Sequence, residues 1–255
     1  MNSTFNRSKF KLVGNVHTVD VEFSNLEIVD GEAFEKYKTQ EYLRFDEEGN
    51  LLEEISGYRD LVDQVYRDIY VRGATGHLIE REEYSRDGIL LGKTIFVPDE
   101  VGNLEERHFY VQPSNKQLVL GSLTKFNLDN EPIENLYYSV DGKIASRNKP
   151  GDTPHSWEER TVTPASDGSV VEVNSFDVNG TFTMKAVIKL DRLENELEST
   201  RYDPDGTMWQ HWKNEYEFDE TGNWTNCLQR YWVIGWGPHN LIPFTKTVRR
   251  ISYYT

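Results

Sequence analysis

Aromatic and histidine side chains are concentrated near the end of the chain, between residues 209 and 239. They are Trp209, His211, Trp212, Tyr231, Trp232, Trp236 and His239. Aromatic rings together with a few polar groups are typical of small-molecule pockets and of protein interfaces. These seven residues are therefore the candidate binding residues. Two alternatives stay open: the rings form a C-terminal aromatic core, or His211 or His239 acts in catalysis.

No other group of residues has the spacing of a catalytic, metal or cofactor site. The six histidines include no His-x-His pair, and the single cysteine, Cys227, is expected to be buried and unreactive. The glycines are dispersed and form no phosphate-binding loop. Nothing singles out two catalytic carboxylates among the 43 acidic residues. We therefore predict no catalytic residue, no metal ligand and no cofactor.

The charge of the chain restricts its partners. With 28 basic and 43 acidic residues, the net charge is −15. Such a charge repels nucleic-acid phosphates and anionic membrane surfaces, so neither is expected as a partner. It favours a basic protein as partner, and a small molecule or a glycan is the alternative.

The elements that must position the candidate residues are short strands joined by tight turns. The clearest signal is the repeated unit Phe-Asp-x-x-Gly-Asn at residues 45–50 and 218–223. Its aspartate accepts backbone N–H bonds at the start of a type I turn, and its glycine takes the left-handed conformation that closes the turn. Related copies occupy residues 176–182 and 202–208, looser ones 84–90, 96–104 and 138–144, and two copies without the glycine 126–133 and 190–197. The acidic residues in 46–49 and 203–206 look like calcium loops, but they lack the distal glutamate of such loops, so we predict turns.

This spacing predicts an all-β fold, an antiparallel meander of tandem hairpins with about 12–16 strands. The sheet is expected to be curled, barrel-like or two-layered. Residues 1–255 are predicted to form a single β-repeat domain, with a candidate break near residues 148–156, where prolines and a glycine cluster. At most one short helix is expected, over Tyr58–Ile69, where apolar residues have helical spacing. A strand over Val65–Val71 is the alternative.

The turn units resemble the YD-repeat (RHS-like) family, whose repeats read roughly Tyr-Asp-x-x-Gly-Asn-Leu. The match is carried by Phe45, Asp46, Gly49, Asn50 and Leu51. It is also carried by Phe218, Asp219, Gly222 and Asn223, with Trp224 in place of the leucine. The resemblance implies a β-repeat scaffold. Large members of the family form shells around toxin domains, and small bacterial members are mostly uncharacterised.

Three functional hypotheses follow. The first is a non-enzymatic β-repeat interaction protein, for example an immunity-type protein that neutralises a basic toxin or partner. The second is an enzyme or a binding protein that acts on a small molecule or a glycan through the Trp- and His-rich C-terminal region. The third is an envelope or secreted structural module.

Geometry and location distinguish these hypotheses. An enzyme predicts a deep pocket lined by Trp209, His211, Trp232 and His239 with converging acids, whereas a docking protein predicts a flat or gently concave face. Residues 1–10 are polar and lack the apolar segment of a signal peptide. The sequence as given therefore predicts a cytoplasmic protein, and an export signal upstream would make it secreted or envelope-bound.

Overall fold

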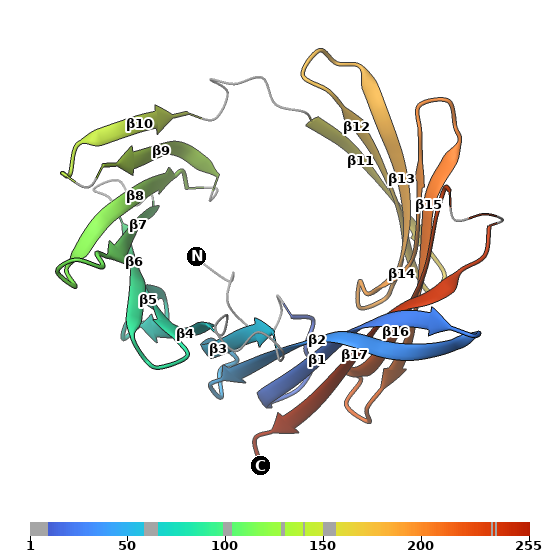
Figure 1. Ribbon diagram of the computed structural model, residues 1–255, viewed down its shortest axis with the longest axis horizontal. Coiled ribbons are helices and arrows are strands. Elements are labelled where there is room, and N and C mark those ends of the chain that lie inside the picture. Colours follow the sequence, from blue (N-terminus) through green and yellow to red (C-terminus); the bar gives the residue numbers. More distant parts are fainter. Residues whose placement is uncertain are drawn as a thin grey trace. The chain divides into compact units, whose positions relative to one another are not determined.

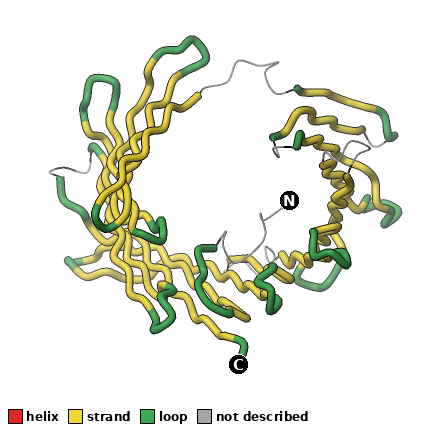
Figure 2. Tube along the Cα trace, turned by 180° about the vertical axis from the view of Figure 1, so that it is seen from behind, coloured by secondary structure: helices red, strands yellow, loops and turns green. Residues whose placement is uncertain are grey.

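The computed structural model describes residues 10–58, 66–98, 104–128, 131–139, 141–149, 157–235, 237 and 239–255. In these residues it contains 17 β-strands and no helix (Figures 1 and 2). The predicted all-β antiparallel meander is confirmed. No helix long and apolar enough to cross a membrane occurs within these ranges.

The chain divides into two compact units. Among the described residues, unit 1 comprises residues 41–149 and unit 2 comprises residues 10–40 and 157–255. Strand β2 (Glu32–Phe45) runs from unit 2 into unit 1. Residues 150–156, in the candidate break, lie outside the described residues, so a single domain with a break there stays a prediction.

Unit 1 is a meander in which each strand pairs with the next one along the chain (Figure 1). Its strands are β3 (Leu51–Tyr58), β4 (Tyr66–Arg72), β5 (Leu78–Ser85), β6 (Leu90–Pro98), β7 (Leu104–Val111), β8 (Leu118–Phe126), β9 (Pro132–Tyr138) and β10 (Ile144–Asn148). All of these pairs are antiparallel, which requires only the short turns that the sequence predicts.

Unit 2 continues the same pattern and then pairs its last strand with its first. Its strands are β1 (Val16–Val29), β11 (Trp157–Ala165), β12 (Gly168–Phe176), β13 (Phe182–Asp191), β14 (Glu196–Tyr202), β15 (Met208–Phe218), β16 (Trp224–Val233) and β17 (Ile242–Tyr253). Strands β11 to β17 pair in chain order, and β17 also pairs antiparallel with β1 (Figure 1). Strands β1 and β17, which are far apart in the sequence, therefore lie side by side within this unit.

The turn unit has the predicted geometry. In the first copy, Asp46 N donates to Asn50 O at 2.9 Å, and Gly49 N donates to Asp46 O at 3.0 Å. Gly49 has a φ of 87°, in the left-handed region that favours glycine. Asp46 Oδ1 accepts from the backbone N of Asn50 at 2.7 Å, as expected for an aspartate that opens a turn. Local chemistry thus fixes where the chain reverses.

One copy without a glycine keeps the same geometry. Asp191 N donates to Asn195 O at 2.9 Å, and Asp191 Oδ1 accepts from Asn195 N at 2.8 Å. Glu194 takes the position that glycine has elsewhere and has a φ of 62°. A residue with a Cβ is strained there. The turn therefore forms at the expense of local stability.

Two reciprocal substitutions test this account of the turns. Gly222, with a φ of 95° and no atom near an added Cβ, should on replacement by alanine lower the free energy of unfolding by about 1–2 kcal/mol. Glu194→Gly should raise it by about 0.5–1 kcal/mol, because the relief of strain exceeds the added entropy of the unfolded chain. Urea unfolding measures both. If the free energy of unfolding changed in the same direction in both variants, the result would contradict a left-handed conformation at these turn positions.

The apolar core is small and lies on the sheet faces. In unit 2, Val171, Val173 and Ala186 are buried against Ile188 and Leu190 of the neighbouring strand. In unit 1, the largest buried side chains are Leu43, Phe45 and Leu51, around the first turn unit. Successive residues of each strand point to opposite faces of the sheet.

The structure differs from the sequence prediction in two details. The helix over Tyr58–Ile69 does not form where it is described, because Tyr66–Arg72 is strand β4, as the alternative predicted; residues 59–65 lie outside the described part. The strand number also exceeds the predicted range. The prediction overlooked the turn at Asp30 and Gly31, which has no aromatic residue in front of it, and the turn at Lys116, which has no glycine.

Candidate functional site

The structure places six of the seven candidate residues on two neighbouring strands and the loop that follows them. Trp209, His211 and Trp212 lie on β15, Tyr231 and Trp232 on β16, and His239 in the loop before β17. The seventh, Trp236, lies outside the described residues. In the antiparallel register, Trp212 is opposite Tyr231, and His211 is opposite Trp232.

Residues that face each other across two neighbouring strands lie on the same face of the sheet, and successive residues along one strand alternate between the two faces. The pair Trp212 and Tyr231 therefore lies on one face, and the pair His211 and Trp232 lies on the other. We name the face of β14–β17 that carries Trp212 and Tyr231 the aromatic face. The face that carries His211 and Trp232 is named the histidine face. The described residues of the predicted group therefore lie on both faces of the sheet.

The aromatic face contains an open cavity of about 500 Å³. It is lined by Glu196, Arg201, Gln210, Trp212, Asn214, Gln229, Tyr231 and Phe244, which we name the aromatic–amide surface. Its rings form a row: the centroids of Trp212 and Tyr231 are 6.2 Å apart, and those of Tyr231 and Phe244 are 5.0 Å apart. The rings are tilted by 42° and 33°, so they follow the surface without stacking.

A β-bulge brings a further tryptophan to this surface. The register between β14 and β15 shifts at Tyr202 and Met208, which leaves Trp209 as the extra residue. The Arg201 guanidinium lies 5.9 Å from the Trp209 ring and 5.0 Å from the Trp212 ring. Arg201 is thereby held between two aromatic side chains by cation–π contacts. Arg201 Nε and Trp209 Nε1 are buried and have no hydrogen-bond partner in the described part of the chain.

Hydrogen bonds fix the polar side chains of the aromatic–amide surface. Arg201 Nη1 donates to Gln210 Oε1 at 3.2 Å, and the Gln210 amide donates to the Tyr231 hydroxyl. Gln229 Nε2 donates to Asn214 Oδ1 at 3.1 Å. Each primary amide has two donor hydrogens and two acceptor lone pairs, so part of this capacity remains for a ligand.

Glu196 anchors one end of the surface. Its carboxylate accepts a hydrogen bond from Trp212 Nε1, and its backbone oxygen accepts from Asn214 Nδ2 at 2.7 Å and from the Tyr216 hydroxyl at 3.0 Å. These bonds hold the orientation of the Trp212 ring before any ligand arrives. Orientation fixed in advance reduces the entropy lost on binding.

The histidine face holds a different arrangement. His211 is hydrogen-bonded at one ring nitrogen to Glu198 and at the other to His239, both at 2.8 Å. The two imidazoles are stacked with centroids 5.0 Å apart, and the buried Trp232 meets His239 edge-on. Glu198 also pairs with Lys189 at 2.6 Å. Both ring nitrogens of His211 are thus used within the protein.

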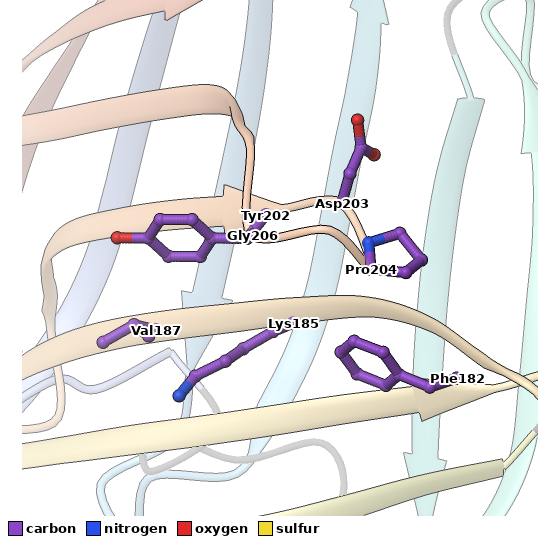
Figure 3. A pocket seen from close by; sticks show the side chains of 7 residues that line it. All are labelled: Phe182, Lys185, Val187, Tyr202, Asp203, Pro204 and Gly206. Atoms are coloured by element: carbon purple, nitrogen blue, oxygen red, sulfur yellow. The ribbon is translucent and has the colours of Figure 1, made fainter.

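A second cavity lies on the histidine face, at the end of β13 and β14 (Figure 3). It measures about 370 Å³ and is lined by Phe182, Lys185, Val187, Tyr202, Asp203, Pro204 and Gly206. Lys185 pairs with Glu172 at 3.0 Å. The turn at 203–206 has the predicted backbone bonds, with Asp203 N donating to Thr207 O at 2.9 Å. In the described ranges, no group of three acidic, histidine or cysteine side chains is arranged to hold a metal ion.

The enzymatic prediction required Trp209, His211, Trp232 and His239 in one deep pocket with converging acids. The structure does not group them in this way, because Trp209 lies against Arg201 of the aromatic face, whereas the other three lie on the histidine face. Cys227 was predicted to be buried and is partly buried; burial raises the pKa of its thiol, against opposite effects of Tyr216 and Arg249. A raised pKa leaves less of the reactive thiolate.

Sequence reasoning missed the polar half of the aromatic–amide surface. Gln210 and Asn214 lie two residues on either side of Trp212, so the period of two along a strand is a signal that identifies them. Arg201, Gln229 and Phe244 come from other strands. Their positions follow only from the register of β14–β17, which the sequence does not reveal.

Together these features define a class: an all-β protein of tandem antiparallel hairpins with an open aromatic and amide-lined surface on one sheet face. No family model and no curated protein matches the chain. Similar solved structures include a porin-like protein from Bacteroides uniformis, with 9% identity over 91% of this chain and 96% of that chain and a TM-score of 0.39. A LolA superfamily protein from Nitrosomonas europaea has 9% identity, 97% and 90% coverage and a TM-score of 0.34. A putative outer membrane lipoprotein-sorting protein domain from Vibrio parahaemolyticus has 10% identity, 98% and 90% coverage and a TM-score of 0.32.

The comparisons overturn the resemblance to the YD-repeat family. The similar structures include LolA-superfamily, lipoprotein-sorting, DUF1329 and porin-like proteins, and no family model, of YD repeats or otherwise, matches the chain. The physical reason for the error is that Asp and Gly at these positions specify a tight turn, which hairpins of unrelated proteins also use. At TM-scores below 0.5, none of these likenesses transfers a function to this chain.

Proposed function

We propose that the chain is a non-enzymatic binding protein that takes a saccharide on the aromatic–amide surface. The observation that carries this proposal is the combination of a row of three rings with three side-chain amides in one open cavity of about 500 Å³. Small-molecule sites typically measure about 300–1,000 Å³, so one or two sugar rings fit the space.

The chemistry of the lining matches that of a sugar. A pyranose ring has an apolar C–H face, which packs against an aromatic face such as that of Trp212 or Tyr231. Its edge carries hydroxyl groups that both donate and accept hydrogen bonds. Gln210, Asn214 and Gln229 offer both functions from planar amides at the edge of the rings.

The charge of the lining also favours a neutral ligand over a basic protein. It contains one carboxylate, Glu196, and one guanidinium, Arg201, so it carries none of the acidic excess of the whole chain. The comparisons give no support to a basic protein partner or to an immunity-type role. A glycan or another small molecule, the second hypothesis from the sequence, agrees better with this surface.

The location is part of the proposal. The names of two similar structures refer to a porin-like protein and to a putative outer membrane lipoprotein-sorting protein domain. We place the binding function in the bacterial envelope instead of the cytoplasm. Fractionation of the native host tests this, and recovery of the chain only with cytoplasmic markers would contradict it.

A titration with two soluble disaccharides, cellobiose and N,N′-diacetylchitobiose, tests the saccharide proposal. We expect binding of at least one of them, measured by calorimetry and by tryptophan emission. Trp212→Ala should weaken this binding about tenfold or more, which corresponds to about 1.4 kcal/mol. The loss follows from removal of the Trp212 ring, which forms one end of the row and contacts Tyr231.

The matched control is Lys213→Ala, because Lys213 is the next residue on β15, is exposed and faces the opposite side. The affinity of the Lys213→Ala variant for the disaccharide should equal that of the unmodified chain. Equal losses in the two variants, or no binding of either disaccharide to the unmodified chain, would refute the proposal.

A further inference from the structure

A small cavity of about 160 Å³ lies on one face of unit 1, across strands β5 to β8. It is lined by Arg81, Thr94, Phe96, Glu106, His108, Ser122 and Thr124. The register places these residues in two adjacent rows. One row is Arg81, Thr94, His108 and Ser122, and the other is Phe96, Glu106 and Thr124.

The two charged groups of this cavity are complementary but not paired. In the described part of unit 1, neither Arg81 nor Glu106 forms an ion pair, with each other or with another side chain. Arg81 Nη2 donates only a long hydrogen bond of 3.4 Å to the Thr94 hydroxyl, which also lies 3.2 Å from His108 Nδ1. A cation and a carboxyl therefore face the same small space.

The opposite face of the same strands carries ion pairs. There, Lys93 pairs with Glu80 at 2.7 Å, and Glu105 pairs with Arg107 at 2.7 Å. Lys125 lies 3.4 Å from Glu134. These charges of the opposite face are neutralised by direct contact, whereas Arg81 and Glu106 do not pair with each other. At the cavity they are held apart.

The surroundings of the cavity increase the cost of leaving its charges unpaired. Thr94 and Phe96 are buried, so water has limited access to the part of the cavity that they line. Burial raises the pKa of the Glu106 carboxyl, against the opposing effect of the Arg81 charge. Burial likewise lowers the pKa of His108, and Arg81 adds to this effect while Glu83 opposes it. An added charge of the right sign next to each group would offset this cost.

We infer that this cavity is a binding site for a small zwitterion, such as an α- or β-amino acid, whose carboxylate pairs with Arg81 and whose ammonium group pairs with Glu106. The hydroxyl groups of Thr94, Ser122 and Thr124 provide further hydrogen bonds to either end. A molecule with one charge would leave one of the two protein groups unpaired. The inference does not depend on the saccharide proposal, which concerns unit 2.

The volume limits the size of the ligand. A cavity of 160 Å³ has the volume of roughly five water molecules, since each occupies about 30 Å³ in the liquid. This space suits a molecule of about five to eight heavy atoms. Alanine and β-alanine are of this size.

An NMR titration of the ¹⁵N-labelled full chain tests the inference with four probes: L-alanine, β-alanine, propionate and ethylammonium. We expect at least one of the two amino acids to shift amide signals of β5–β8 and to bind at least tenfold more tightly than either single-charge probe. Arg81→Gln and Glu106→Gln should each remove this preference. The matched control, Glu105→Gln, changes the neighbouring residue on the opposite face and should keep it.

Each other outcome overturns the inference. Propionate binding as tightly as alanine would show an anion site at Arg81 alone. Ethylammonium binding equally well would show a cation site at Glu106 alone. No binding of the amino acids, or signal shifts away from β5–β8, would show that the cavity takes no such ligand. Circular dichroism of the variants checks that they are folded. Arg81→Lys keeps the positive charge and should retain part of the affinity for the amino acid.

Discussion

Replacing Asn223 by alanine should lower the free energy of unfolding by about 2–4 kcal/mol, the largest effect that we expect from one substitution in a turn unit. The Asn223 side chain is 1% exposed. Its Oδ1 accepts from Val13 N at 2.6 Å, and its Nδ2 donates to Val13 O at 2.8 Å and to the Tyr253 hydroxyl at 2.9 Å. Alanine removes all three bonds and leaves the part-buried N–H and C=O of Val13 without them, whereas the Tyr253 hydroxyl keeps its bond to Asp219. The asparagine thus joins a turn near the end of the chain to the segment before β1.

Asn50→Ala is the matched control, because Asn50 occupies the same position in the first turn unit. Its side chain makes only a local bond, from Nδ2 to Asp46 Oδ2 at 3.0 Å. We expect a loss of about 1 kcal/mol there. Thermal unfolding and hydrogen exchange of residues 10–15 distinguish the two variants. Equal stabilities, or unchanged exchange of Val13 in Asn223→Ala, would show that the buried bonds do not hold this segment.

Asp68→Asn should stabilise the protein at pH 7.5 and have little effect at pH 4. Burial raises the pKa of Asp68 to about 6; Arg81 opposes the rise, while Glu83 and Glu54 add to it. Asp68 Oδ1 is also buried without a hydrogen-bond partner among the described residues. Between about pH 4 and pH 6, the folded chain therefore keeps a proton that the unfolded chain has released. Stability from this group falls as the pH rises through that interval.

The expected size of the Asp68 effect follows from the shift in pKa. A shift of about two units corresponds to roughly 3 kcal/mol, and solvent screening of this half-buried group reduces it to about 1–2 kcal/mol. Urea unfolding of the variant and the unmodified chain at both pH values measures the difference. A gain of the same size at pH 4 and pH 7.5 would contradict the titration of Asp68 as its cause.

A control of opposite sign is available at Asp177. The pKa of this aspartate is lowered by backbone hydrogen bonds, first from Thr181 and then from Asn179, so its ionised form is favoured in the folded state. Asp177→Asn should therefore destabilise the protein at neutral pH, and this loss should shrink as the pH falls. A stabilising effect at neutral pH would contradict the role of the turn aspartate.

Turns were predictable because their chemistry is local. Asp46 and Gly49 fix a reversal within four residues, and no distant contact is needed to interpret them. The same locality explains two errors. The turn at Lys116 carries a left-handed residue without a glycine, and the apolar spacing of Tyr58–Ile69 resembles a helix although pairing with β3 and β5 makes Tyr66–Arg72 a strand.

The candidate site was only half predictable, because it depends on register. The period of two along a strand separates Trp212 from His211 and Tyr231 from Trp232. Only the register shows that Trp212 shares its face with Tyr231 and His211 with Trp232. The bulge at Trp209 adds a further change of face that no sequence pattern marked. No signal in the sequence marked the cavity in unit 1, because Arg81 lies on β5 and Glu106 on β7, and strand β6 lies between them.

The most direct test of the saccharide proposal is saturation-transfer difference NMR on the unmodified chain with the disaccharide that binds best. Irradiation of aromatic protons should transfer saturation mainly to the ring C–H protons of the sugar, because these pack on Trp212 and Tyr231. The transfer should be lost in Trp212→Ala and kept in Lys213→Ala. Transfer that persists unchanged in Trp212→Ala, or none in the unmodified chain, would contradict saccharide binding at this surface.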